Sequence, residues 1–245
     1  MNTYFNINYE FDKQEVHRAI EAAQKGYICV ADGVIVNSAK RNPEYMKVVN
    51  GSMFSICDSS WVPVYLKSIY GVKYEQYCGA EIFKDIVSSR KYRMIFMGTQ
   101  QKTLDGLKKE LMKMNPDVEG MQFVELPFRN VEDFDYPEIA KMIEADQPKI
   151  IWVALGAPKQ ERFMNMLLPY LTSGVMIGVG AAFKFYSGTE ESRCPEWMQR
   201  WHMEFVYRIM QDPKKQLVRC YWIIKTLPGM YFEEVRKKRQ SVKKG

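Results

Sequence analysis

Short apolar segments alternate with helical segments through the first 193 residues, and this alternation limits the fold more than any other feature. The apolar segments have the length expected of strands that are buried on both faces. Strands that alternate with helices form a parallel sheet, because each crossover helix returns the chain to the same edge. The sequence therefore predicts an α/β fold with a Rossmann-like, mostly parallel sheet flanked by helices. The expected strands are ICVA (28–31), MFSIC (53–57), YRMIFM (92–97), MQFVEL (121–126), KIIWVA (149–154) and GVMIGV (174–179).

The expected helices carry recognisable start and stop signals. Asp12, with Glu15 three residues later, resembles a capping box, in which two side chains bond backbone N–H groups at a helix start. Val16 and Ile20 share one face of that helix, and we expect Gly26 to end it. Further helices are expected within LDGLKKELMKM (104–114) and PEIAKMIEA (137–145).

The strand pattern ends near residue 194, and the remaining segments are helical in spacing and basic. Residues 195–211 and 213–227 both begin with proline, which suits the first helical turn. We therefore expect an α/β core at residues 1–193 and a helical, basic C-terminal appendage at residues 194–245. The appendage holds 12 Lys and Arg against 5 Asp and Glu, a net charge of +7, whereas the core holds 23 against 24.

The basic appendage has three interpretations. Trp197, Trp201, Tyr221 and Trp222 alternate with basic residues, as in helices that dock on an anionic membrane surface. A nucleic-acid-binding protein would also have such a segment, but basic density over the core would then be expected. A solvated basic terminus is the third interpretation. Membrane docking without nucleic acid is the expected interpretation, because residues 1–193 hold 23 Lys and Arg against 24 Asp and Glu.

Composition disfavours several other classes of protein. The five cysteines are scattered and include no Cys-x-x-Cys pair, which indicates reduced thiols in the cytoplasm. No signal segment opens the chain, and its longest apolar run, residues 174–183, is about half of the ~20 residues that a membrane span needs. With only His17 and His202 present, we expect no metal site, no Ser/His/Asp triad and no cofactor. The oligomeric state stays open, and a homo-oligomer is compatible with the sequence.

The residues that follow each expected strand are candidates for a binding site, because parallel sheets bind ligands beyond the carboxyl ends of their strands. A nicotinamide-dependent enzyme shares this architecture, but GVGAAF (178–183) has Phe183 where the dinucleotide motif needs its third glycine. MGTQQKTLDG (97–106) lacks the Gly-Lys-Ser/Thr of an ATPase loop. The candidates are Asp32, Asp58, Gly98, Phe128, Gly156 to Glu161 and Gly180 to Lys184.

Three blocks of the sequence together resemble a known family. LGAPKQE (155–161), GVGAAFKFYSG (178–188) and residues 192–219 match, in order and spacing, motifs of the WecG/TagA/CpsF family, glycosyltransferase family 26. A weaker likeness extends through residues 29–49 and 54–63. The resemblance implies an inverting, metal-independent transferase that moves a sugar, of the N-acetylmannosamine type or related, from a UDP-sugar. The acceptor would be a polyprenyl-diphosphate-linked sugar at the inner face of the membrane, in the biosynthesis of a cell-surface polysaccharide.

The resemblance also implies a catalytic residue. Asp58 matches an Asp that is proposed as the catalytic base, which would accept the proton of the acceptor hydroxyl as that oxygen attacks the anomeric carbon. From the residues alone, Asp58 followed by Ser59 and Ser60 is also typical of a helix cap.

Substrate-binding residues are implied in the same way. Gln160 would hold sugar hydroxyls, Lys159 would face phosphate, and Phe128 would stack on the uracil unless it belongs to the core. Glu161 can be explained by its place at a helix N-terminus. Cations of the appendage would close over the site and stabilise the diphosphate. The full set of expected binding residues is Asp32, Phe128, Gly156, Lys159, Gln160, Gly180, Lys184, Arg208, Lys214, Lys215 and Arg219.

The chain departs from the family pattern at several of these positions. Asp32, Val30 and Ser59 stand where the family usually has Asn, Thr and Gly. Lys184 replaces an Asp that is suited to bond a ribose hydroxyl, and lysine cannot accept such a bond. Lys184 would then approach the diphosphate, or point to solvent while Phe183 and its neighbours pack in the core.

Overall fold

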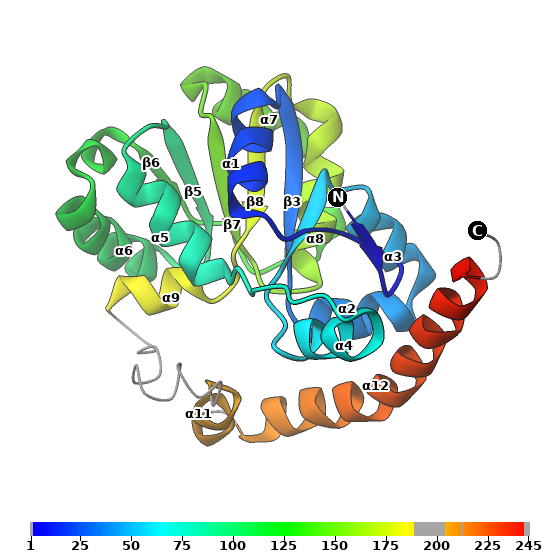
Figure 1. Ribbon diagram of the computed structural model, residues 1–245. Helices are drawn as coiled ribbons and strands as arrows, with labels where there is room; N and C mark the ends of the chain where they lie inside the picture. Colours follow the sequence, from blue (N-terminus) through cyan, green and yellow to red (C-terminus); the bar gives the residue numbers. More distant parts are fainter. Residues whose placement is uncertain (1, 189–203, 212, 243–245) are drawn as a thin grey trace.

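The computed structural model describes residues 2–188, 204–211 and 213–242 and confirms the α/β fold (Figure 1). Within these residues the strands form one eight-stranded sheet in the order β1-β2-β4-β3-β8-β7-β5-β6. Every neighbouring pair is parallel except β1 and β2. The strands are β1 (Asn2–Tyr4), β2 (Ile7–Glu10), β3 (Lys25–Ala31), β4 (Phe54–Cys57), β5 (Met94–Gly98), β6 (Gln122–Val124), β7 (Ile150–Ala154) and β8 (Gly174–Gly178).

Helices cover both faces of the sheet and enclose two apolar clusters. One face is covered by α1 (Lys13–Ala22), α5 (Gly79–Ser89), α6 (Gln101–Met114) and α9 (Ala182–Ser187). The other is covered by α2 (Gly33–Arg41), α3 (Pro43–Asn50), α4 (Trp61–Tyr70), α7 (Tyr136–Asp146) and α8 (Lys159–Leu167). Short 3-10 helices span Pro116–Gly120, Val131–Asp133 and Leu168–Tyr170, and the chain continues through α11 (Glu204–Gln211) and α12 (Pro213–Val242).

The predicted strands are all present, but the predicted end of the first helix is wrong. Asp12 caps α1 as expected, accepting hydrogen bonds from the backbone N–H groups of Gln14 and Glu15. The helix ends at Ala22, and Gly26 lies inside β3. A Cβ on Gly26 would lie 2.5 Å from the Met53 sulfur, so the glycine permits a close approach between β3 and the segment before β4.

The N-terminal hairpin of β1 and β2 has no equivalent among the predicted elements. Its turn residues, Phe5 and Asn6, both have positive φ angles, of 52° and 64°. Tight hairpin turns of this kind usually carry Asn-Gly or Asp-Gly, because glycine adopts positive φ without steric cost. The Phe5-Asn6 pair therefore did not indicate a hairpin turn in the sequence.

α12 is longer than predicted, because it continues through Pro228 to Val242. Pro228 is exposed, so water can replace the helix hydrogen bond that proline removes. Beyond it, Met230 is 3% exposed and packs in the core cluster that α2, α3 and α4 also line. The second half of α12 is therefore packed against the body of the protein.

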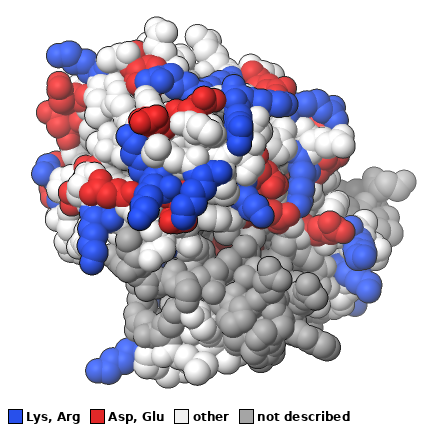
Figure 2. All heavy atoms as spheres, turned by 90° about the vertical axis from the view of Figure 1, so that its left-hand side faces the viewer, with Lys and Arg blue, Asp and Glu red and all other residues white. Residues whose placement is uncertain are grey.

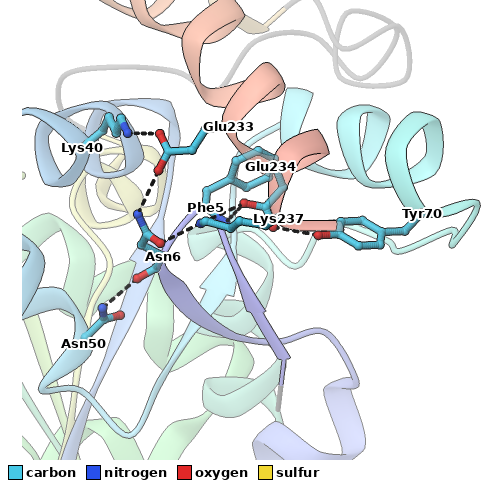
Figure 3. Close-up of polar contacts among 8 residues, drawn as sticks. All are labelled: Phe5, Asn6, Lys40, Asn50, Tyr70, Glu233, Glu234 and Lys237. Carbon is cyan, nitrogen blue, oxygen red and sulfur yellow. Dashed lines mark hydrogen bonds and ion pairs between the residues drawn. The ribbon is translucent and has the colours of Figure 1, made fainter. Parts of the chain in front are cut away.

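A buried carboxylate fixes the end of α12 to the N-terminal hairpin (Figure 3). Glu234 is 2% exposed and accepts hydrogen bonds from the Phe5 backbone N–H and the Tyr70 hydroxyl, both at 3.0 Å. Lys237 bridges Glu234, at 3.2 Å, and the side chain of Asn6, at 2.7 Å. Charge-assisted bonds of this kind hold the positive-φ turn and α12 together.

We expect Glu234→Ala to lower the free energy of unfolding by about 2 to 4 kcal/mol, because buried donors would lose their acceptor. Urea denaturation followed by circular dichroism measures the change. Glu119→Ala, at an exposed position of the Pro116–Gly120 helix, is the control and should change stability little. A Glu234→Ala protein as stable as the control would show that the contact does not anchor α12.

Candidate active site

Two aspartates follow neighbouring strands at the carboxyl edge of the sheet. β3 and β4 pair with Ala31 opposite Cys57, so Asp32 and Asp58 emerge side by side. The Asp58 backbone N–H donates to the Ala31 carbonyl at 3.2 Å, and Gln76 donates to the Asp58 carbonyl at 3.1 Å. These bonds fix the backbone of Asp58 at the point where the chain leaves the sheet.

The two aspartates have different local roles. Asp32 is the N-cap of α2, and one of its oxygens accepts hydrogen bonds from the Val34 and Ile35 N–H groups, both at 2.9 Å. Asp58 is half-buried and lies two residues before Ser60, which is the N-cap of α4. A capping role therefore describes Asp32 better than Asp58, and the catalytic role of Asp58 stays a prediction.

Gln160 joins the two glycine-containing motifs of the sequence. It lies in the first turn of α8, is 3% exposed, and accepts a hydrogen bond at 3.1 Å from the backbone N–H of Gly180. A Cβ on Gly178 would lie 3.0 Å from the Gln160 amide nitrogen, so that glycine leaves room for the side chain. Gln160 thus fixes the loop after β8 to the start of α8.

The neighbouring glycines allow the chain to turn at this edge. Gly156 and Gly180 have φ angles of +74° and +52°, which non-glycine residues adopt only with strain. Gly98, at the end of β5, has a φ of +121°, and a Cβ there would lie 2.4 Å from the Ala154 carbonyl oxygen. The turns at the ends of β5, β7 and β8 therefore depend on glycine.

Glu161 was expected at a helix N-terminus, and the structure shows that it is also completely buried. One oxygen accepts a hydrogen bond from the Tyr45 hydroxyl of α3 at 2.8 Å. The other, Oε1, has no hydrogen-bond partner among the described residues. Burial raises the pKa of the Glu161 carboxyl to about 7, although hydrogen bonds from its neighbours act in the opposite direction.

This raised pKa predicts a pH-dependent stability. The contribution of Glu161 is fully present below pH 4.5 and is lost as the pH rises through about 7, because only the folded state resists ionisation. The difference corresponds to about 3 kcal/mol. We expect Glu161→Gln to match the wild type near pH 4.5 and to exceed its stability above pH 7, in urea denaturation at several pH values. Parallel stability curves for the two proteins would contradict the assignment.

Lys159 and Phe128 meet at the same edge. The Phe128 ring is fully exposed (104%), so the alternative that it belongs to the core is wrong. The Lys159 ammonium lies 5.3 Å from the centre of that ring and donates a hydrogen bond to the Arg129 carbonyl. An exposed ring beside a cation could accept a flat base and its phosphates.

Lys184 is half-buried on α9, the helix that follows the Gly180 loop. Phe183 beside it is completely buried, and its ring lies 5.7 Å from that of Phe83. Phe183 thus packs in the core. This agrees with the alternative in which Phe183 is a core residue.

α12 contacts the carboxyl edge directly. A Cβ on Gly33, the first residue of α2 after Asp32, would lie 3.1 Å from the Ile223 side chain and 3.4 Å from the Trp61 indole nitrogen. Ile223 belongs to α12, and Trp61 follows Asp58 by three residues. Both α11 and the first half of α12 lie on the side of the sheet where its parallel strands end (Figure 1).

The appendage residues named from the sequence are not all equivalent. Arg219 is half-buried and precedes Ile223 by one helical turn, so it lies on the side of α12 that faces the edge. Lys214 is exposed on the opposite side. The side chains of Arg208 and Lys215, and the whole of Trp197 and Trp201, lie outside the described residues. Trp222 faces the body, with the Arg41 guanidinium 3.7 Å from its ring centre.

The outer face of α12 carries apolar side chains together with Lys and Arg side chains. None of its residues is acidic, because both carboxylates of the helix, Glu233 and Glu234, contact the body. The exposed residues that share this face at helical spacing are Lys214, Leu217, Val218, Tyr221, Ile224, Lys225, Pro228, Phe232, Arg236 and Arg239.

Three properties of the described residues bear on partners. No three His, Cys, Asp or Glu side chains among them gather as a metal site. None of the helices in the described ranges is both long and apolar enough to cross a bilayer. On the face shown in Figure 2, basic and acidic side chains are mixed, which is not the single-sign surface expected for nucleic-acid binding.

Comparisons with known proteins agree with the motifs. Two relatives, from Bacillus spizizenii and Bacillus subtilis, are 26% identical over 77% and 79% of this chain, and 72% and 78% of their own. A third, from Staphylococcus aureus, is 21% identical over 89% of this chain and 82% of its own. All three are named N-acetylglucosaminyldiphosphoundecaprenol N-acetyl-beta-D-mannosaminyltransferase. The family model "Glycosyl transferase WecG/TagA/CpsF family" matches residues 4–243, and the chain therefore belongs to that family of glycosyl transferases.

Proposed function

We propose that this protein transfers a sugar of the N-acetylmannosamine type, or a related one, from a UDP-sugar to a polyprenyl-diphosphate-linked N-acetylglucosamine. The observation that carries the proposal is the carboxyl edge, where Asp58, the Gln160–Gly180 contact and the Lys159–Phe128 pair follow the ends of parallel strands. The relatives' names supply the sugar and the acceptor. The product would be an intermediate of a cell-surface polysaccharide.

The proposed reaction is a single displacement. The acceptor hydroxyl loses its proton to the Asp58 carboxylate while its oxygen bonds to the anomeric carbon. The bond from that carbon to the UDP oxygen breaks at the same time, so the configuration inverts and UDP leaves with the electron pair. Lys159 and Arg219 are the fixed cations that would stabilise the diphosphate as its charge develops.

The acceptor's polyprenyl chain would hold the reaction at the inner face of the membrane. The outer face of α12 suits such a surface, because exposed Leu217, Tyr221, Ile224 and Phe232 are accompanied by cations and by no carboxylate. Its inner side contacts the catalytic edge through Ile223. We therefore propose that residues 194–245 dock a cytoplasmic, peripheral enzyme on anionic lipid and complete its site.

We expect transfer to continue in a strong chelator, since cations of the chain would neutralise the leaving diphosphate. Product formation with and without excess EDTA, after dialysis against chelator, measures this. Complete loss of product that only magnesium or manganese restores would contradict metal independence.

A binding series tests the function against its two alternatives. Calorimetric titration with UDP should give saturable binding, whereas NADH and a short RNA duplex should not bind at physiological salt. Saturable NADH binding without UDP binding would favour a nicotinamide-dependent enzyme. Salt-sensitive RNA binding, with no response to anionic vesicles, would favour a nucleic-acid-binding protein.

A further inference from the structure

Glu161 lies where the first turn of α8 meets β3 and α3. It is completely buried, which is unusual for a glutamate in the first turn of a helix. Its contact with the Tyr45 hydroxyl, at 2.8 Å, joins α8 to α3. Asn165, one turn later on α8, donates to the Tyr27 hydroxyl of β3 at 3.1 Å. The side of α8 that faces the interior is thus held by polar contacts as well as by packing.

The residue before Glu161 is the one that contacts the catalytic edge. Gln160 accepts the Gly180 N–H at 3.1 Å, and its own backbone N–H donates to the Gly156 carbonyl at 3.0 Å. Consecutive residues of one helical turn move together, so a shift at Glu161 would move the Gln160 amide and the two glycine loops. The buried carboxyl is therefore placed to set the position of the Gln160 amide and of the two glycine loops.

We propose that Glu161 is a positioning residue for sugar transfer, whose buried carboxyl holds the first turn of α8 against α3 and so keeps Gln160 and the Gly180 loop in place. This inference rests on the proposed function. Oε1 of Glu161 is buried and has no hydrogen-bond partner among the described residues, so burial disfavours the ionised form.

The groups around Glu161 act on the pKa of its carboxyl in both directions. Tyr27 and Cys29 face it from β3, and Tyr45 faces it from α3. Asp32, at the end of β3, contributes a like charge that opposes ionisation. The Arg162 guanidinium lies 5.9 Å from the centre of the Tyr45 ring. Burial is the largest cause and raises the pKa of Glu161, and Asp32 raises it further, whereas hydrogen bonds from Gln160 and Tyr45 lower it.

A first experiment follows the Gly180 amide without substrate. In full-length protein labelled with ¹⁵N-glycine, the chemical shift of the Gly180 amide proton should change with pH, with an apparent pKa near 7. The reason is that ionisation of Glu161 would move Gln160, whose side-chain oxygen accepts the hydrogen bond from Gly180. Gly71, at the exposed end of α4, should not titrate, and the Gly180 shift should be pH-independent in Glu161→Gln. A Gly180 amide that does not titrate, or that titrates equally in Glu161→Gln, would overturn the proposal.

A second experiment measures transfer. Glu161→Gln, which keeps an acceptor for Tyr45, should retain kcat within about threefold at pH 6 and exceed the wild type above pH 7.5. Glu161→Ala should lower kcat about tenfold or more, with little change in the KM for the donor, since Glu161 does not touch substrate. Glu138→Gln, in the exposed first turn of α7, is the matched control. Unchanged kcat in Glu161→Ala would overturn the proposal.

The two experiments separate this inference from the proposed function. Should Glu161→Ala fail to fold, the Gly180 titration in the wild type and in Glu161→Gln still decides the question. If no sugar is transferred at all but the Gly180 amide still titrates in a way that depends on Glu161, the positioning contact is supported. Only the proposed reaction is then ruled out.

Discussion

We expect Asp58→Asn to lower turnover about a hundredfold or more while leaving the fold and donor affinity unchanged. Asparagine has the shape of aspartate but cannot accept the proton that the acceptor hydroxyl must lose. The backbone of residue 58 is held by its bonds to Ala31 and Gln76, which the substitution does not touch. Initial rates at saturating donor and acceptor, together with UDP titration and circular dichroism, measure the effect.

The matched control is Asp117→Asn, at an exposed position of the Pro116–Gly120 helix. It makes the same chemical change in the segment that precedes β6, and not at the carboxyl edge of the sheet. We therefore expect it to keep normal turnover. An Asp58→Asn enzyme within a few-fold of the wild type would rule out Asp58 as the base. A pH–rate profile that keeps its acidic limb in this variant would lead to the same conclusion.

The second large effect concerns the outer face of α12. We expect Tyr221→Ser combined with Ile224→Ser to weaken binding to anionic vesicles about a hundredfold, since each exposed apolar side chain contributes about 1.5 kcal/mol or more when buried in lipid. The two side chains are 57% and 67% exposed, so the folded body should not depend on them. Co-sedimentation with phosphatidylglycerol vesicles measures the loss.

Val64→Ser supplies the control, because Val64 on α4 is 63% exposed and lies off the outer face. Transfer to a short-chain, water-soluble acceptor should survive in the double variant, since its changes leave Ile223 and Arg219 in place. Vesicle binding that is equal in the double variant and the control would contradict docking through α12. The basic appendage would then be a solvated terminus.

The sequence predicted the parts of the fold that depend on local pattern. β4, β5, β7 and β8 are buried runs of apolar residues, and such runs are recognisable wherever they lie in the chain. β6 was less well predicted, because it lies at the sheet edge and is only half-buried. The candidate edge followed from the rule that parallel strands end on the same side.

The contacts between distant segments could not be predicted from the sequence. Glu161 has the ordinary position of a first-turn glutamate, and its burial depends on α3 packing against α8. Likewise Lys237 and Lys238 belong to a basic run that suggests lipid, but Lys237 bonds Glu234 and Asn6, and Lys238 bonds the Ile69 carbonyl. Such roles depend on tertiary neighbours, which no local pattern specifies.

The most direct measurement of the central claim is product formation by the purified full chain. UDP-N-acetylmannosamine and other UDP-sugars would each be mixed with a short-chain polyprenyl-diphosphate N-acetylglucosamine, and the products would be analysed by mass spectrometry and NMR. We predict a lipid-diphosphate disaccharide with inverted anomeric configuration, formed from at least one donor and absent in Asp58→Asn. Release of UDP and free sugar without a disaccharide, or no reaction with any UDP-sugar, would contradict the account.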